Sequence, residues 1–161
     1  MTIKVGEKLP EASFKIMTAD GPAAVSTADY FGGAKVALFA VPGAFTPTCH
    51  ARHLPGFVDN IEKFKAKGID KIACVSVNDV FVMDAWAKAG GASDDIDFLA
   101  DGSADFTKAI DLVLDGSALG MGIRSLRYSM LVDDGVVTSL NVEDVPSSAE
   151  ASGAEALLDQ I

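Results

Sequence analysis

Two nearly continuous apolar runs of strand length, KVALFAV at 35–41 and KIACVSV at 71–77, constrain the fold most strongly. A strand with one face in water alternates apolar and polar residues, whereas runs like these belong inside a sheet that is covered on both faces. Between them, residues 48–67 carry apolar side chains at helical spacing, and Gly68 ends the pattern. Two strands joined by such a helix form a right-handed unit whose strands are parallel.

The helix expected over 48–67 contains an interruption. Phe57, Ile61 and Phe64 follow one another at spacings of four and three, which places them on one face. Pro55-Gly56 lies inside this stretch, and a proline lacks an amide proton and clashes with the preceding turn. We therefore expect a break or kink at Pro55-Gly56.

The remaining elements are short and are marked by turn and cap residues. The expected strands are 12–18, 96–100, 128–132 and 136–142, with turns at 20–22 and 133–135 and a long surface loop at 112–125. The expected helices are a short one capped by Ser26-Thr27, one over 82–89 capped by Asn78-Asp79, one over 103–111 begun by Ser103, and a C-terminal one behind the capping box Ser147-Ser148-Ala149-Glu150.

This order of elements predicts an α/β fold with a mixed central β-sheet and helices on both faces. The early strands are expected to be parallel, and the hairpin over 128–142 adds antiparallel strands at one side. The length of 161 residues is typical of one domain, so residues 1–161 are expected to fold as a single unit. The core is expected to contain Leu38, Val75, Val77, Trp86, Leu131 and Leu140.

Charge and composition exclude several classes of partner. The formal net charge of −10, without a cluster of basic residues, argues against nucleic acid and anionic membrane surfaces. The first ten residues, MTIKVGEKLP, lack the apolar region of a secretory signal, and no apolar run approaches the ~18 residues of a membrane span. Two cysteines are too few for a disulfide framework, so a cytoplasmic location is expected.

One of these cysteines occupies a position suited to chemistry. The strand at 35–41 leads into VPGAFTPTC, so Cys49 falls where the strand has ended and the helix begins. Sites in open α/β sheets form at the carboxyl ends of strands, and the free amides of a helix start stabilise a thiolate. Cys49 is therefore a candidate nucleophile, with a buried packing role as the alternative. Cys74, inside KIACVSV, is interpreted as a packing residue.

Several kinds of cysteine chemistry fit poorly. A dithiol exchange needs a second cysteine three residues before Cys49, where the chain has Thr46. A structural zinc site needs four ligands, but His50 and His53 are the only histidines and only His53 shares a helix face with Cys49. A histidine on the same helix is also badly placed as the base of a hydrolase, so both histidines are interpreted as surface or cap residues. No metal and no cofactor is expected.

Attack of a thiolate on a peroxide fits better. This reaction gives a sulfenic acid, and its transition state spreads negative charge over sulfur and two oxygens. Fixed donors stabilise that charge, and the Thr46 hydroxyl lies three residues before Cys49. Pro42 and Pro47 stiffen the loop and keep the sulfur in one position.

The segment PGAFTPTC, from Pro42 to Cys49, matches the P-x-x-x-[TS]-x-x-C signature, and here the chain resembles the peroxiredoxins. With HLPGF, VSVND, FLADGSADF, RSLRYSMLVDDGVV and LNVE, it resembles the type II, peroxiredoxin-5-like class over nearly its whole length. The resemblance implies a thioredoxin-like fold, a homodimer, and reduction of hydrogen peroxide and organic hydroperoxides.

The resemblance also implies roles for single residues. Cys49 is the peroxidatic cysteine, Thr46 binds the thiolate and the peroxide, and Pro42 shields the site. Of the two arginines in RSLR, the position before the aromatic-Ser strand start is Arg127, which is expected to keep the sulfur ionised and to steady the transition state. Arg124 is expected at most to assist it.

One departure from the class concerns the resolving cysteine that some members carry near the C-terminus. The corresponding segment, 143–150, contains none. We therefore expect a one-cysteine enzyme whose sulfenic acid is reduced by an external thiol, either glutathione with glutaredoxin or thioredoxin. The alternatives are a peroxide sensor and a redox-inactive thioredoxin-like adaptor, neither of which would consume peroxide in the steady state.

Overall fold

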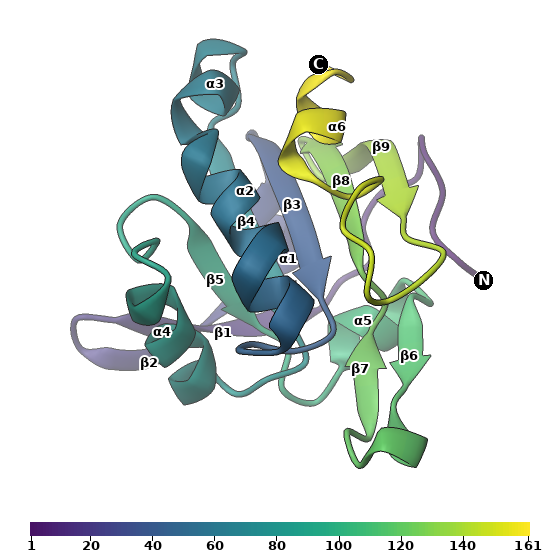
Figure 1. Ribbon diagram of the computed structural model, residues 1–161. Coiled ribbons are helices and arrows are strands. Elements are labelled where there is room, and N and C mark those ends of the chain that lie inside the picture. The colour runs from purple at the N-terminus through teal and green to yellow at the C-terminus, as the bar shows by residue number, and fades with distance from the viewer.

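The computed structural model describes residues 1–161, which form a mixed seven-stranded sheet between two layers of helices (Figure 1). Its strands are β1 (Ser13–Thr18), β2 (Gly21–Ser26), β3 (Lys35–Val41), β4 (Lys71–Ser76), β5 (Asp97–Ala100), β8 (Tyr128–Asp133) and β9 (Val136–Val142), in the order β2-β1-β5-β4-β3-β8-β9. The apolar runs β3 and β4 are parallel neighbours in the middle, as expected. The first expected strand is not parallel, because β1 pairs antiparallel with β5.

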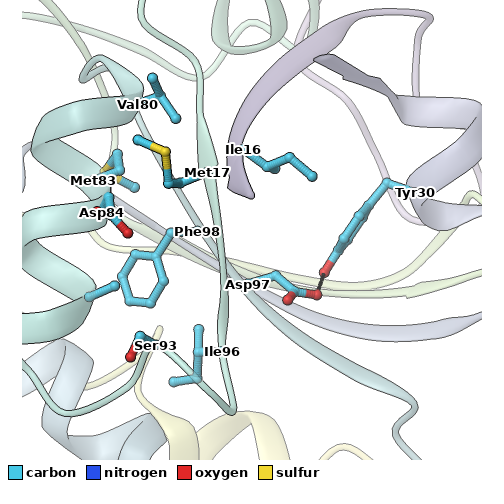
Figure 2. Close-up of a pocket in the computed structure, with 11 residues that line it drawn as sticks. Ile16, Met17, Tyr30, Val80, Met83, Asp84, Ser93, Ile96, Asp97 and Phe98 are labelled. Carbon is cyan, nitrogen blue, oxygen red and sulfur yellow. Dashed lines mark hydrogen bonds between the residues drawn. The ribbon is translucent and has the colours of Figure 1, made fainter. Parts of the chain in front are cut away.

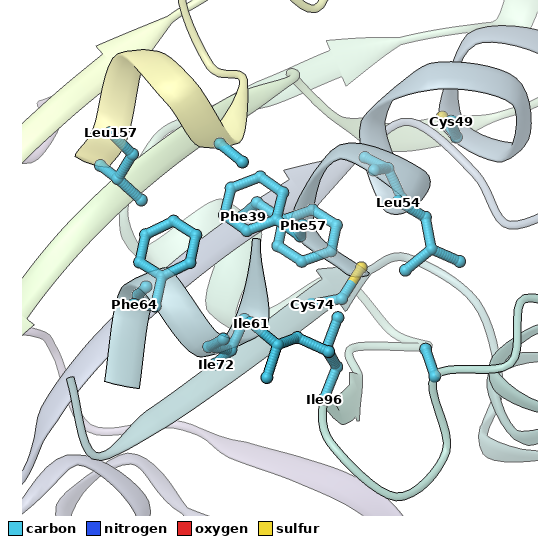
Figure 3. Packing of buried hydrophobic residues seen from close by; sticks show 14 of the residues in the cluster. Phe39, Cys49, Leu54, Phe57, Ile61, Phe64, Ile72, Cys74, Ile96 and Leu157 are labelled. Atoms are coloured by element: carbon cyan, nitrogen blue, oxygen red, sulfur yellow. The ribbon is translucent and has the colours of Figure 1, made fainter. Parts of the chain in front are cut away.

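Helices cover both faces of the sheet, which confirms the predicted fold class. The helices are α1 (Thr27–Phe31), α2 (Leu54–Asp59), α3 (Ile61–Ala66), α4 (Val80–Ala89), α5 (Asp105–Ala109) and α6 (Ala154–Leu158). One apolar cluster packs α2, α3, α4 and α6 on the sheet, and the other packs α1 and α5 on the opposite face. In the first cluster, Phe57 stacks on Phe39 with ring centroids 4.0 Å apart (Figure 3). None of the helices is long and apolar enough to cross a bilayer.

The helix after β3 accommodates its proline in an unexpected way. The His50 amide donates to the Thr46 carbonyl, so the helix begins directly after Thr46. Residues Cys49–His53 form one wide π-turn, η1, in which the Leu54 amide donates to the Cys49 carbonyl. This wide turn moves the backbone away from the Pro55 ring, and the helix continues through Pro55-Gly56 without a break. The break lies instead at Asn60, between α2 and α3.

Two segments expected to lack strands contain them. Strand β2 begins inside the turn expected at 20–22 and continues to Ser26; it is an edge strand, so Pro22 needs no ladder partner for its missing amide. The expected loop at 112–125 is a hairpin of β6 (Val113–Asp115) and β7 (Ile123–Ser125), with a 3₁₀ turn, η2 (Ser117–Leu119), at its tip. These strands are too short for a period of two to stand out from the sequence.

Two expected helix starts are wrong. Ser103 does not cap α5; the carboxylate of Asp101 accepts hydrogen bonds from the Phe106 and Thr107 amides instead. The capping box Ser147-Ser148-Ala149-Glu150 does not begin a helix, since α6 starts only after Gly153. The residues before Gly153 are held by a different group, the carboxylate of Glu143.

The expected core is confirmed with one exception. Five of its members are buried: Leu38, Val75, Val77, Trp86 and Leu131. Leu140 is only half-buried, because β9 is the last strand of the sheet and packs against fewer elements.

Candidate active site

The sheet brings two distant parts of the chain together at the carboxyl end of β3. The loop after β3 carries Pro42, Thr46 and the first helical turn with Cys49. Strand β8 runs antiparallel to β3, and its first residue, Tyr128, pairs with Ala40. The beginning of β8 therefore lies beside the end of β3, which places Arg127 next to the loop that holds Cys49.

Cys49 is completely buried and is surrounded by polar groups on one side. Its Sγ accepts a hydrogen bond from Arg127 Nη2 at 2.9 Å, and Thr46 Oγ1 lies 2.8 Å away. Thr46 Oγ1 is also 2.7 Å from the Gly43 carbonyl. The hydroxyl has one proton, so it can donate either to Gly43 or to the sulfur. A thiolate at Cys49 draws this proton, because a charged acceptor forms the stronger hydrogen bond.

The guanidinium of Arg127 is held on all sides. The side chain is 2% exposed, and its Nε donates to the Pro146 carbonyl at 3.0 Å while Nη1 donates to His53 Nδ1 at 3.0 Å. Because arginine only donates, His53 Nδ1 must be the unprotonated nitrogen. His53 Nε2 then carries the proton and donates it to the Ser152 carbonyl at 2.9 Å.

His53 is neutral for a physical reason. Burial lowers its pKa from the usual 6.5 to about 4; the Ser152 carbonyl opposes this shift and the adjacent Arg127 guanidinium reinforces it. The neutral ring is the form that can accept a hydrogen bond from Arg127 at physiological pH. His53 therefore connects the arginine to the segment that follows β9.

Pro42 and Arg124 lie at the loop that holds Thr46 and Cys49. Pro42 is buried, and its carbonyl accepts from Arg124 Nη1 at 3.4 Å, while Arg124 Nε donates to the Met121 carbonyl at 2.9 Å. A Cβ at Gly43 would lie 3.0 Å from Arg124 Nη1 and 3.0 Å from Thr46 Cγ2. Arg124 thus packs on the loop, whereas Arg127 donates to Cys49 itself.

The sequence reasoning missed part of this arrangement. His53, expected at the surface or as a cap, is 1% exposed and contacts Arg127. The available signal was its spacing of four from Cys49, which puts both on one helix face. Pro146 and Ser152 take part through their backbone carbonyls, so no pattern of side chains in the sequence could predict these two hydrogen bonds.

The second cysteine has different surroundings. Cys74 lies in β4 and is fully buried in the apolar cluster, where Figure 3 shows it beside Phe57. Burial raises the pKa of its thiol well above the usual value. Both cysteines are free.

Other parts of the molecule offer less for chemistry. No group of three or more His, Cys, Asp or Glu side chains is arranged to hold a metal ion. A cavity of about 200 Å³ lies between β1, α4 and β5 and is lined mainly by apolar side chains (Figure 2). At one end Tyr30 donates to Asp97 at 2.7 Å, and burial raises the pKa of Tyr30. None of the sequence-predicted site residues lines this cavity.

Comparison with known proteins identifies the family to which the chain belongs. The Redoxin family model matches residues 4–158. Rice (Oryza sativa subsp. japonica) "Peroxiredoxin-2E-2, chloroplastic" is 48% identical, over 97% of this chain and 72% of the relative, and rice "Peroxiredoxin-2C" is 46% identical over 97% and 96%. The crystal structure of reduced Prx3 in complex with H₂O₂ from Vibrio vulnificus superposes with a TM-score of 0.93 at 51% identity, over 98% of both chains. The chain therefore belongs to the Redoxin family and, within it, to the type II peroxiredoxins.

Proposed function

We propose that Cys49 is the peroxidatic cysteine of this thiol-dependent peroxidase and that it reduces hydrogen peroxide and organic hydroperoxides. The observation that carries the proposal is the enclosure of Sγ by two donors, Arg127 Nη2 at 2.9 Å and Thr46 Oγ1 at 2.8 Å. Both groups can donate hydrogen bonds to a thiolate. Both also remain in place when charge moves from sulfur to a bound peroxide.

The reaction follows from these contacts. The thiolate attacks the terminal oxygen of the hydroperoxide, a sulfur–oxygen bond forms, and the O–O bond breaks. Sulfur loses two electrons and becomes a sulfenic acid, while the leaving alkoxide or hydroxide takes a proton and departs as alcohol or water. Arg127 stabilises the negative charge that is shared by sulfur and both oxygens in the transition state.

Thr46, Pro42 and Arg124 have supporting roles in the proposal. The Thr46 proton turns from the Gly43 carbonyl toward the sulfur or the peroxide as charge develops. Pro42, buried and without an amide proton, shields the site from water. Arg124 fixes the Pro42 carbonyl, and so the loop, without touching the sulfur.

An external thiol reduces the sulfenic acid back to the thiol, as expected for a one-cysteine enzyme. The segment 143–150 supplies no resolving cysteine, and Cys74 is held in the middle of the sheet with no exposed surface. An incoming thiolate displaces water from the sulfenic acid and forms a mixed disulfide, and a second thiol then releases Cys49. Glutathione with glutaredoxin, and thioredoxin, are the candidate reductants.

Two arms of one experiment test this function. Peroxide consumption is followed with glutathione and glutaredoxin, and separately with thioredoxin and its reductase. Sustained turnover in either arm is expected. One turnover that then stops would favour a peroxide sensor, and absence of any reaction would favour an inactive adaptor. A Cys49–Cys74 disulfide, found by mass spectrometry after peroxide treatment, would contradict the one-cysteine mechanism.

A homodimer in the cytoplasm completes the proposal. Phe45 and Phe81 are 49% and 65% exposed, and both follow strands that end at the same edge of the sheet, β3 and β4. Large exposed apolar side chains on one edge are typical of an interaction surface. Two free cysteines fit a reducing compartment. Sedimentation of the wild type and of Phe45→Ser tests the dimer, and loss of association in the variant is expected.

A further inference from the structure

A buried carboxylate lies behind the active-site arginine. Glu143 directly follows β9 and is 8% exposed. Its carboxylate accepts from the Ser152 amide at 2.6 Å, the Ser152 hydroxyl at 2.5 Å and the Ala151 amide at 3.2 Å. Burial alone raises the pKa of this carboxyl, but the hydrogen bonds from Ser152 and Ala151 outweigh it and lower the pKa.

These hydrogen bonds close the segment 144–153, which we call the strap. The strap contains no helix or strand, and most of its side chains are exposed. Its ends are joined through Glu143, because the residue that begins the strap accepts from Ser152 near its other end. No other side chain of the structure accepts hydrogen bonds from strap amides, so this carboxylate is the one side-chain acceptor that holds the two ends of the strap together.

The closed strap presents its carbonyls to the active site. The Pro146 carbonyl accepts from Arg127 Nε, and the Ser152 carbonyl accepts from His53, which in turn accepts from Arg127 Nη1. The Ser147 carbonyl accepts from Thr48 Oγ1 at 3.2 Å, directly beside Cys49. Two of the three nitrogens of the guanidinium are therefore oriented by the strap, and the third donates to the sulfur.

We propose that Glu143 is a positioning residue for the peroxidase reaction: it closes the strap, and the strap aims Arg127 at Cys49. This inference rests on the proposed role of Cys49 and Arg127. Glu143 does not touch the sulfur or the substrate, so its effect is transmitted through the Pro146 and Ser152 carbonyls. A displacement of the guanidinium by about 1 Å is enough to slow a reaction substantially.

The replacement Glu143→Gln tests the proposal with little change in volume. The glutamine amide offers one acceptor oxygen in place of two and adds a donor where three donors already converge. The second-order rate of Cys49 oxidation by hydrogen peroxide, measured by stopped flow, is expected to fall about ten- to a hundredfold. Glu150→Gln is the matched control, since this exposed side chain of the strap makes no hydrogen bond or ion pair, and it should react like the wild type.

A double-variant cycle separates positioning from general loosening. If Glu143 acts through Arg127, adding Glu143→Gln to Arg127→Gln slows the reaction no further. Multiplying losses would overturn the proposal, as would a wild-type rate in Glu143→Gln. An inactive wild type would instead overturn the function proposed for Cys49.

A second variant keeps the test decisive should Glu143→Gln fold poorly. Ser152→Ala removes only one of the three donors to Glu143, and the backbone amide bond remains. A smaller slowing is expected, again absent when Arg127 is already glutamine. Unchanged kinetics in a normally folded Ser152→Ala would count against the strap as a positioning device.

Discussion

The two cysteines have the same exposure and opposite surroundings. Both are 0% exposed and both belong to the same apolar cluster. Arg127 and Thr46 contact the sulfur of Cys49, whereas no side-chain donor contacts that of Cys74. A buried sulfur becomes a nucleophile when fixed donors stabilise its charged form, and burial without donors keeps the thiol neutral.

The backbone explains why the donors are available at only one of the two positions. Cys74 lies in the centre of β4, where the main-chain groups are used in ladders with β3 and β5. Cys49 lies in the first turn of a helix, where amides have no acceptor within the helix and the chain must curve away from the sheet. The same residue type therefore packs in the core at one position and has donors at the other, where we propose a chemical role.

The largest expected effect comes from removing the reactive sulfur. Cys49→Ser replaces the thiolate with a hydroxyl that stays neutral at physiological pH, so peroxide turnover should be abolished with either reductant. Steady-state assays measure this. Residual turnover above the uncatalysed rate would mean that another residue is the nucleophile, and Cys49 would then not differ from Cys74 in function.

Removing the charged donor should give the next largest effect. Arg127→Gln keeps a neutral donor near Sγ but loses the charge, and the rate with hydrogen peroxide should fall about a hundred- to a thousandfold. Arg124→Gln is the comparison variant, because Arg124 donates to the Pro42 carbonyl and not to the sulfur. Equal losses in both variants would contradict the assignment of Arg127.

Acid should destabilise the folded protein through His53, which contacts Arg127 beside Cys49. The pKa of His53 is about 4 in the folded protein against 6.5 ordinarily, so between these values the unfolded chain binds more protons. The free energy of unfolding should fall by up to about 3 kcal/mol as the pH is lowered from 6.5 to 4. Denaturant titrations across this range should show a weaker pH dependence in His53→Gln than in the wild type.

The smallest expected effect concerns the other sulfur. Cys74→Ser should leave peroxide turnover close to that of the wild type, because Cys74 has no step in the mechanism. The variant buries a hydroxyl among apolar groups, so its free energy of unfolding should fall by about 1–3 kcal/mol. Cys74→Ala, which buries no polar group, separates this cost from simple loss of volume. A large loss of turnover in both folded variants would make Cys74 a resolving cysteine.

The sequence was most informative where a pattern is long or chemically specific. The runs at 35–41 and 71–77 predicted the central parallel strands, since seven consecutive β-forming residues have few other places in a fold. Leu131, in the expected strand 128–132, and Trp86, in the expected helix over 82–89, were also placed in the core correctly. The position of Cys49 between a strand and a helix was enough to single it out from Cys74.

The sequence was least informative where a single tertiary contact determines the local structure. Ser103 and Ser147 look like helix caps, but Asp101 and Glu143 hold the neighbouring amides. His53 looks like a surface residue until the strap covers it. The Asp101 and Glu143 contacts reach beyond the spacing of a capping box, and the His53 contact ends on a backbone carbonyl. Local propensity describes neither kind of contact.

The complete burial of Cys49 also sorts its reaction partners by size. A sulfur with no exposed surface is out of reach for the thiol of a protein reductant, such as the glutaredoxin or thioredoxin proposed above, as long as the helical turn keeps this shape. If a protein thiol reduces Cys49 as we propose, this helical turn must adopt a second, more open shape for that step. The rate at which a bulky disulfide reagent labels Cys49 then measures how often the helical turn opens.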